Sequence, residues 1–217
     1  CIAFIIVCTG IVSRVNKKLG KKEIALFKKL KSPAKVQDFL NSIPANMERG
    51  GETCRSPLST LRAGEAHCME GALLGAYILS LHGFAPYIIH LEAKNPDQDH
   101  VFVPFKVGKN WGSISKTNHA VLRYREPVYR NPRELVMSFF HEYFLNSTGE
   151  KTLRSYTMPI DLRKFGKEWI TREGDVWDID EKITKTKHYE IMSASQIKNL
   201  RKAEKIEIEA GKIVEWK

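Results

Sequence analysis

The chain has 217 residues, of which 42% are hydrophobic and 28% are charged; this globular composition excludes wholesale disorder, collagen and coiled coil, and the length fits one domain. A chain of this size buries about 70–75% of its unfolded surface, so it can fold without disulfides or metals. The net charge of +10 comes mostly from residues 1–60, with 11 Lys and Arg against 4 Asp and Glu, whereas residues 61–150 balance at 9 against 9, so we expect no nucleic-acid partner.

Residues 1–20 form an N-terminal apolar and basic segment whose role stays open. Its basic residues follow the apolar run, whereas in a signal peptide the positive charges come first. The segment can be the remnant of an export or anchor signal, an element packed on the domain, or the product of a truncated start. No apolar run reaches the roughly 20 residues of a membrane span, and the four cysteines form no CxxC pair. We therefore expect a cytoplasmic protein with no membrane span, no structural metal and no cofactor.

Two helices are predicted next. Apolar residues recur at three-residue spacing from Lys21 onward, which is typical of an amphipathic helix. Ser32 followed by Pro33 indicates an N-cap with proline at the first helical position, and Pro44 ends this second helix. Residues 45–60 are rich in Gly, Ser and Pro and are predicted to form a loop.

Residues 64–83 predict a buried helix, with Cys68 near its start and Gly83 at its end. Small and apolar residues surround this segment on almost all sides, which is typical of a helix inside a core. Gly71 and Gly75, together with neighbouring alanines, leave one side of this helix without bulky side chains. Another segment of backbone can therefore approach that side closely.

Strands are predicted after this helix, where β-branched and aromatic residues lie between turn residues. Their ranges are 86–93, 100–107, 111–115 and 121–124, with a turn at Gly108-Lys109. A helix is predicted over residues 132–144, a short strand over 176–179 and a helix over 194–202. We take residues 21–150 as the core and residues 151–217 as a C-terminal extension of the same domain.

Cys68 and His100 form the strongest candidate for chemistry. A helix N-terminus favours the thiolate form of a cysteine, and the thiolate is the nucleophile in cysteine catalysis. A hairpin that turns at Gly108-Lys109 places Phe102 opposite Ser115. The side-chain period of two then puts His100 and Ser115 on one face, so a hydroxyl group can orient the imidazole.

These segments together resemble the transglutaminase-like superfamily, a group with a papain-like cysteine fold. The order is a cysteine at the start of a helix, a histidine at the start of a strand, and a third residue after a tryptophan on the paired strand. The matching stretches are Gly64–Cys68, Gly83–Pro86, Asp99–Val103 and Trp111–Ser115, with Ser32-Pro33 and Val36–Leu40 as the leading helix. The resemblance covers about residues 30–145 and is most similar to bacterial members.

The resemblance implies an α+β, papain-like core in which a buried helix carrying the cysteine packs on an antiparallel β-sheet. It implies Cys68 as nucleophile, His100 as general base and Ser115 as the third catalytic residue. The substrate would be a peptide or protein amide, cleaved by a protease or amidase or passed on by acyl transfer through a thioester on Cys68. The family usually has aspartate at the third position, and a serine hydroxyl does not stabilise imidazolium by charge.

Seven further residues are candidates for orienting the triad or binding substrate: Asn118, Trp111, His67, Asp99, Lys116, Arg123 and Arg125. Asp99 points to the opposite face from His100 if the strand is regular, and Asn118 reaches the ring only if the strand bulges. The arginines and tyrosines of residues 112–144 can line a cleft for carboxylate or phosphate, or they can pin a helix and loop to the sheet through Arg–Glu pairs. His141-Glu142 beside His119 lacks HExxH spacing, so no metal site is predicted.

Two alternatives to an enzyme remain. Serine in place of aspartate is compatible with a catalytically inactive, protein-binding member of the same fold. The net charge of +10 permits a nucleic-acid-binding protein, against which the neutral central region argues. The sequence does not predict the substrate, the choice between hydrolysis and transfer, or the oligomeric state.

Overall fold

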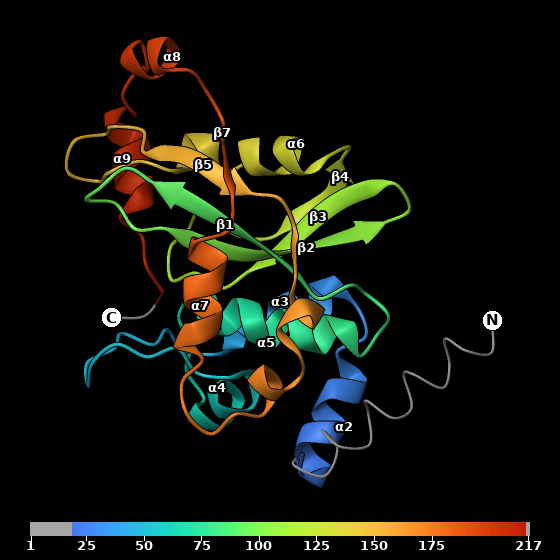
Figure 1. The fold of residues 1–217 in the computed structure, drawn as a ribbon. Helices are drawn as coiled ribbons and strands as arrows, with labels where there is room; N and C mark the ends of the chain where they lie inside the picture. The colour runs from blue at the N-terminus through green and yellow to red at the C-terminus, as the bar shows by residue number, and fades with distance from the viewer. Residues whose placement is uncertain (1–18, 216–217) are drawn as a thin grey trace.

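The computed structural model describes residues 19–215, so the N-terminal segment predicted at residues 1–20 lies outside the described residues except for its last two positions. Figure 1 shows the arrangement of the elements. The helices are α2 (Lys21–Lys29), α3 (Pro33–Ser42), α4 (Pro57–Ala63), α5 (Cys68–Ser80), α6 (Pro132–Met137), α7 (Trp177–Thr184), α8 (Ala194–Lys198) and α9 (Lys205–Gly211), with 3-10 turns η1 (Phe140–Glu142), η2 (Leu162–Phe165) and η3 (Glu168–Ile170). The strands are β1 (Tyr87–Ala93), β2 (His100–Val107), β3 (Asn110–Ser115), β4 (Arg125–Tyr129), β5 (Leu153–Thr157), β6 (Ile160–Asp161) and β7 (His188–Glu190).

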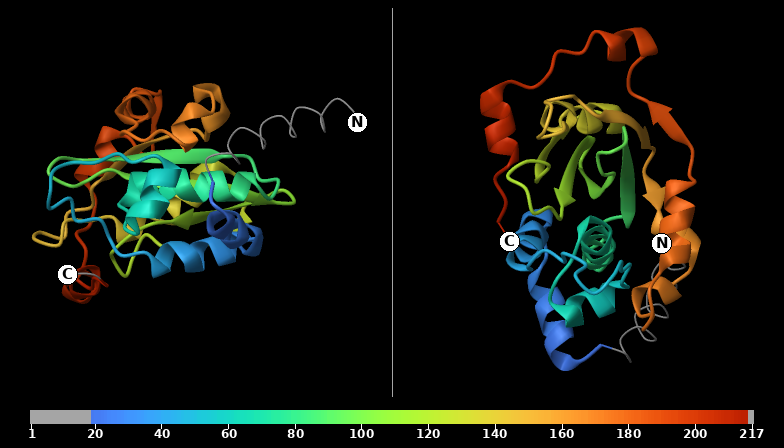
Figure 2. Two further views of the ribbon diagram at one scale, coloured as in Figure 1. Left: turned by 90° about the horizontal axis from the view of Figure 1, so that it is seen from below. Right: turned by 90° about the vertical axis from the view of Figure 1, so that its left-hand side faces the viewer.

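The strands form one sheet in the order β4-β3-β2-β1-β5-β7, and β6 pairs with β1 beside this path. Neighbouring strands of the described sheet are all antiparallel. Helices α3 and α5 cover one face, and α6 lies over the other (Figures 1 and 2). The α+β class and the antiparallel sheet with a buried helix packed on it are therefore as predicted.

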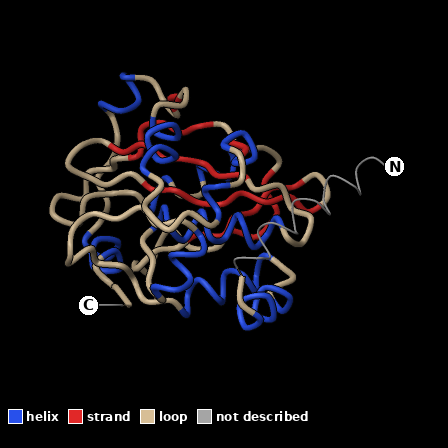
Figure 3. The backbone as a smooth tube through the Cα atoms, turned by 60° about the horizontal axis from the view of Figure 1, so that its bottom comes forward, coloured by secondary structure: helices blue, strands red, loops and turns tan. Residues whose placement is uncertain are grey.

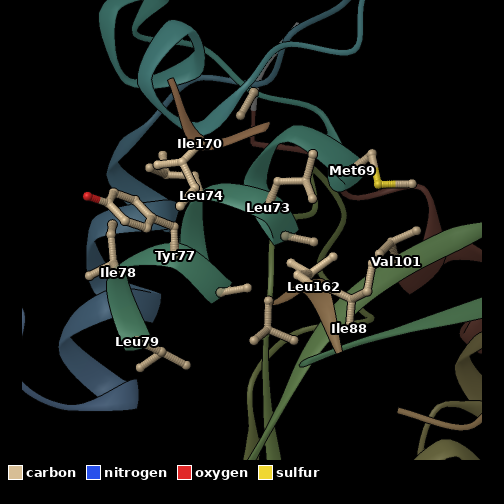
Figure 4. Packing of buried hydrophobic residues seen from close by; sticks show 14 of the residues in the cluster. Met69, Leu73, Leu74, Tyr77, Ile78, Leu79, Ile88, Val101, Leu162 and Ile170 are labelled. Atoms are coloured by element: carbon tan, nitrogen blue, oxygen red, sulfur yellow. The ribbon is translucent and has the colours of Figure 1, made fainter. Parts of the chain in front are cut away.

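Helix α5 is the centre of the larger hydrophobic core. Every residue from Met69 to Leu79 is buried, in agreement with a segment that is apolar nearly all round. Leu73 and Leu74 are fully buried in the same cluster as Ile88 and Val101 of the sheet, and Leu74 lies beside Ile170 (Figure 4). A second cluster fills the space between the other face of the sheet and α6. The rigid helix thus carries its first residue, Cys68, to one end of the sheet.

The side of α5 without bulky side chains contacts the end of β3 and the residue after it, as the glycines predicted. A Cβ atom at Gly71 would lie 2.3 Å from Lys116 Cβ, and one at Gly75 would lie 2.9 Å from Ile114 Cδ1. Gly71 therefore permits the close approach of the helix start and the chain that leaves β3. This approach brings Ser115 beside the first turn of α5.

Local signals placed several elements correctly. The Ser32 side chain accepts a hydrogen bond from the backbone N–H of Lys35 at 3.4 Å, and the helix begins at Pro33 as predicted. The β2–β3 register pairs Phe102 with Ser115, also as predicted. Helix α4 was missed, although its start carries the same signal as α3. Ser56-Pro57, inside the loop predicted for residues 45–60, is a second Ser-Pro start.

Four predicted elements differ from the structure. The helix predicted over residues 194–202 ends at Lys198, with Asn199 as its C-cap. Residues 121–124 are not a strand, because Leu122 has a positive φ of 60°, and the fourth strand begins at Arg125. Residues 176–179 are mostly the start of α7, where acidic residues in the first turn suit a helix N-terminus. The helix predicted over residues 132–144 ends early, since the Ser138 hydroxyl donates to the Leu135 carbonyl at 2.6 Å and competes with the helical hydrogen bonds.

The described part of the C-terminal extension, residues 151–215, completes the sheet. Strand β5 pairs with β1 on the side opposite β2, and β7 pairs with β5 at the edge. Helix α9 and the segment after it return to the loop that follows β3, where Ala120 N–H donates to the Ile213 carbonyl at 3.0 Å. Among residues 19–215, no helix combines the length and apolarity needed to cross a bilayer.

Candidate active site

A cleft of about 620 Å³ lies at the end of the sheet where α5 begins. Figure 3 shows that loops gather on one side of the molecule. Cys68, His67 and His100 line the cleft together with loop residues near positions 45–48, 97–99, 116–122 and 142–147. Figure 2 shows α5 almost end-on below the strands. The cleft is thus formed by the helix start, the strand start and the loops around them.

Cys68 is the first residue of α5, and its half-buried thiol interacts with the side chains of His100 and His67. His100 is the first residue of β2 and is 6% exposed. Its Nε2 lies 2.7 Å from Ser115 Oγ. With Nε2 bound to Ser115, Nδ1 is the ring nitrogen available to the cysteine. The structure thus brings together all three residues that the resemblance implies.

The environment of Cys68 favours the thiolate. Burial alone would raise the pKa of this thiol, but hydrogen bonds from His100 and His67 and the charges of the two rings lower the pKa to about 6. The N-terminus of α5 adds partial positive charge at the same place. The thiol is therefore largely ionised at neutral pH, as nucleophilic cysteines are.

Gln37 of α3 holds Ser115 by both of its backbone groups. Ser115 N–H donates to Gln37 Oε1 at 2.8 Å, and Gln37 Nε2 donates to the Ser115 carbonyl at 2.8 Å. The same amide nitrogen donates to Asn41 Oδ1 at 2.7 Å. Sequence reasoning missed this residue, although a glutamine between the apolar residues Val36 and Leu40 was a visible signal. The clamp extends β3 to its last residue and fixes the hydroxyl that binds His100.

Glu70 lies fully buried two residues after Cys68, and sequence reasoning also missed it. Its carboxylate accepts hydrogen bonds from Thr53 Oγ1 at 2.9 Å, Asn46 Nδ2 at 3.1 Å, and the backbone N–H groups of Arg55 at 3.1 Å and His67 at 3.3 Å. A single charged residue inside an apolar helix was the signal for it. Buried carboxylates need such partners, so this network anchors the loop before α5 to the helix start.

Lys116 and Asp99 line the cleft, but both are bound to the protein scaffold. The Lys116 side chain is fully buried, and its Nζ donates to the Ile43 carbonyl. Burial lowers the pKa of Lys116 to about 8. Asp99 accepts from the Ala93 N–H at 2.8 Å and lies 3.5 Å from His90 Nε2, on the face away from His100. Neither side chain replaces the missing acid behind His100.

Asn118 also lines the cleft, in the loop after β3 rather than on a strand bulge. Its carbonyl accepts from the Glu215 N–H at 3.0 Å, so the C-terminal segment holds this loop. Tyr143 was not predicted as a site residue, yet it borders the cleft, and its hydroxyl donates to the Gln98 carbonyl. These contacts fix two walls of the cleft.

Trp111, Arg123 and Arg125 lie outside the set of cleft-lining residues. Trp111 sits toward the hairpin end of β3, with Lys106 Nζ 4.4 Å from its ring centre. Arg123 pairs with Glu215 at 3.0 Å, and Arg125 pairs with Glu142 at 2.6 Å. The arginines thus pin loops and a helix to the sheet, which is the second of the two interpretations given above.

No protein-family model matches this chain, and no curated protein matches it in sequence. Within residues 19–215, no group of three or more His, Cys, Asp or Glu side chains is placed to hold a metal ion. The chemistry of the cleft is therefore argued from its side chains alone.

Proposed function

We propose that this protein is a transglutaminase-like cysteine enzyme that acts on amide bonds through a thioester on Cys68. The observation that carries the proposal is the chain of contacts from the Cys68 thiol to His100 and from His100 Nε2 to Ser115 Oγ at 2.7 Å. These three side chains lie at the start of a buried helix, beside a cleft large enough for a peptide segment. The substrate class is a peptide or protein amide.

In the first half of the reaction, the Cys68 thiolate attacks the amide carbonyl carbon. Negative charge develops on the carbonyl oxygen, and the N-terminal dipole of α5 stabilises charge at this position. His100, as imidazolium, then donates a proton to the leaving nitrogen. The C–N bond breaks, the amine departs, and the acyl group stays on sulfur as a thioester.

In the second half, neutral His100 takes a proton from the incoming nucleophile, either water or an amine. The nucleophile attacks the thioester, the C–S bond breaks, and Cys68 returns as thiolate. Ser115 orients the ring throughout, since Nε2–H can donate to its oxygen in both protonation states of His100. Water would give hydrolysis, and an amine would give acyl transfer.

The test uses p-nitrophenyl acetate, an activated acyl donor, with detection of p-nitrophenol and of an acetyl adduct on Cys68 by peptide mass spectrometry. We expect a burst of about one equivalent per chain followed by turnover, as covalent catalysis requires. Cys68→Ala should abolish the burst. His100→Ala should slow acylation at neutral pH on the order of 100-fold, the usual share of a general acid–base group.

An absent adduct, or a wild-type rate equal to that of Cys68→Ala, would overturn the proposal. The chain would then be better described as a protein-binding module on this scaffold, because serine at the third position removes the charge that supports imidazolium. Circular dichroism of each variant separates loss of chemistry from loss of fold. Peptide amides, with and without an added primary amine, then distinguish hydrolysis from transfer by their products.

A further inference from the structure

A second imidazole lies against the Cys68 thiol, and it belongs to the preceding residue, His67. His67 is the N-cap of α5, where its Nδ1 accepts a hydrogen bond from the Met69 N–H at 3.3 Å. Its Nε2 lies 2.8 Å from the Thr53 carbonyl oxygen. The ring is thus held from both edges by the backbone, and it interacts with the Cys68 side chain next to it.

These contacts decide where the ring gains a proton. A carbonyl oxygen only accepts, so Nε2 carries hydrogen whenever it binds Thr53. Nδ1 is therefore the atom that titrates. Without a proton, Nδ1 accepts from Met69 and caps the helix; with one, it can donate to the Cys68 sulfur. The long 3.3 Å contact to Met69 belongs to the first state and is given up in the second.

The groups around His67 are mostly acidic. Glu70 Oε1 lies 3.7 Å from Nε2 and Glu48 Oε1 lies 3.9 Å from it, and Asp180 of α7 interacts with the same ring. Arg55 faces Glu70 from the other side, with Nη1 3.8 Å from Oε2.

These surroundings favour the charged ring. Burial lowers the pKa of His67, but the contact with Cys68, the charges of Cys68 and Glu70 and the hydrogen bond to Thr53 together raise it to about 9. The favoured arrangement is a thiolate at Cys68 beside an imidazolium at His67, with the Glu70 carboxylate and the Arg55 guanidinium behind it. The charges alternate in sign along this row and cancel.

We propose that His67, with Glu70 behind it, is a second catalytic histidine that holds Cys68 as thiolate by taking the thiol proton on Nδ1. The S–H bond breaks, the Nδ1–H bond forms, and both charges stay in the cluster. His100, which takes its own proton from solvent, then donates that proton to the leaving nitrogen and regains one from the incoming nucleophile. This assignment rests on the proposed function and deepens it.

The arrangement also accounts for serine at position 115. In the family that the chain resembles, a carboxylate behind the catalytic histidine stabilises imidazolium. Here the buried carboxylate stands behind His67 instead, at Glu70, which is fully buried and accepts four hydrogen bonds. Ser115 orients His100, which a hydroxyl group can do by accepting from the ring N–H.

The decisive variant is His67→Asn. Asparagine is among the best N-cap residues, so it keeps an acceptor for the Met69 N–H while it removes the titrating nitrogen. A matched control is His82→Asn, because the His82 ring also binds a backbone carbonyl, that of Phe27 at 2.8 Å, but lies outside the cleft lining. Thermal unfolding of both variants checks that the fold is intact.

The measurement is the pH dependence of Cys68 alkylation by iodoacetamide, followed by peptide mass spectrometry, with thiolate absorbance at about 240 nm as a second readout. We expect the His67→Asn rate at about pH 6 to fall about tenfold or more, while the rate above about pH 9 matches wild type. His82→Asn should follow wild type throughout. Glu70→Gln should shift the profile in the same direction as His67→Asn, by less.

The outcomes separate this inference from the proposed function. If His67→Asn titrates like wild type while His100→Ala loses the low-pH thiolate, the inference is overturned and the proposed function stands. If the wild-type thiol ionises like a free cysteine, both are overturned. Loss of low-pH reactivity in His67→Asn, with acylation by p-nitrophenyl acetate restored at high pH where the thiol ionises unaided, supports the inference. His100→Ala should not regain turnover at high pH.

Discussion

Replacing Gly71 with alanine should push the start of α5 away from the chain that leaves β3. The added Cβ atom would lie 2.3 Å from Lys116 Cβ and 2.7 Å from Lys116 Cγ. Ordinary van der Waals contact begins near 3.4 Å, so the two segments must separate by about 1.1 Å. The obstacle is next to the Lys116 backbone and cannot rotate away. Ser115 precedes it directly, so the strain reaches the residue that orients His100.

The expected loss of stability follows from two opposing terms. Alanine improves helix propensity over glycine by about 1 kcal/mol. Overpacking a tight core costs about 1–3 kcal/mol, and the upper part of this range applies because backbone has to move. The free energy of unfolding should therefore fall by about 1–2 kcal/mol, which for a chain of this length lowers Tm by about 2–8 °C.

Gly75→Ala is the matched control on the same face of the helix. Its added Cβ would meet Ile114 Cδ1 at 2.9 Å and Leu40 Cδ1 at 3.3 Å, both of which are the ends of flexible side chains. Its free energy of unfolding should stay within about 1 kcal/mol of wild type. Urea denaturation followed by tryptophan fluorescence measures both variants. Gly71→Ala at least as stable as Gly75→Ala would refute the close approach that we describe.

Three further predictions follow from the contacts around the cleft. Gln37→Ala should cost about 1–3 kcal/mol for each Ser115 backbone group left unpaired and slow Cys68 alkylation. Gln37→Glu should not restore the loss in the same urea assay, because a buried carboxylate oxygen would then face the Ser115 carbonyl that Nε2 binds; wild-type stability in Gln37→Ala would count against the clamp. Burial lowers the pKa of Lys116 from 10.5 to about 8, so wild type gains stability as pH rises through this interval. The stability of Lys116→Met relative to wild type should therefore fall from about pH 8 to pH 10. A stability difference that does not depend on pH would contradict this. Burial raises the pKa of Cys54 to about 12, so iodoacetamide should label Cys68 in the native protein and Cys54 only in urea. Peptide mapping measures which cysteine is labelled. Labelling of Cys54 in the native protein would argue against its burial.

Elements with local signals were predicted close to their observed positions. A Ser-Pro pair starts α3, runs of β-branched and aromatic residues between turn residues form β2 and β3, and a Gly-Lys turn joins these two strands. Each signal acts over a few residues, through a cap, a turn or a side-chain period. The register that opposes Phe102 and Ser115 follows from the turn alone. The relation between His100 and Ser115 could therefore be predicted before any tertiary contact was known.

Elements that depend on distant partners were not predicted. Strands β5 and β7 are short, and β5 exists because β1 offers it a free edge. Residues 176–179 have strand-like composition, but packing against the α5 side of the sheet makes them the start of a helix, with Ile179 in the core. Propensity is a weak guide where tertiary packing supplies most of the free energy.

The candidate site shows the same distinction between local signals and long-range contacts. The sequence alone determined the residue types that can react, a cysteine at a helix start and a histidine at a strand start, because helix ends and strand alternation are local properties. Only the tertiary structure showed that Gln37 clamps Ser115 from 78 positions away, that Glu70 turns inward, and that His67 shares the thiol with His100. The free energies of these contacts depend on burial and on distances across the core. Neither quantity exists until α3, α5 and the sheet have packed together.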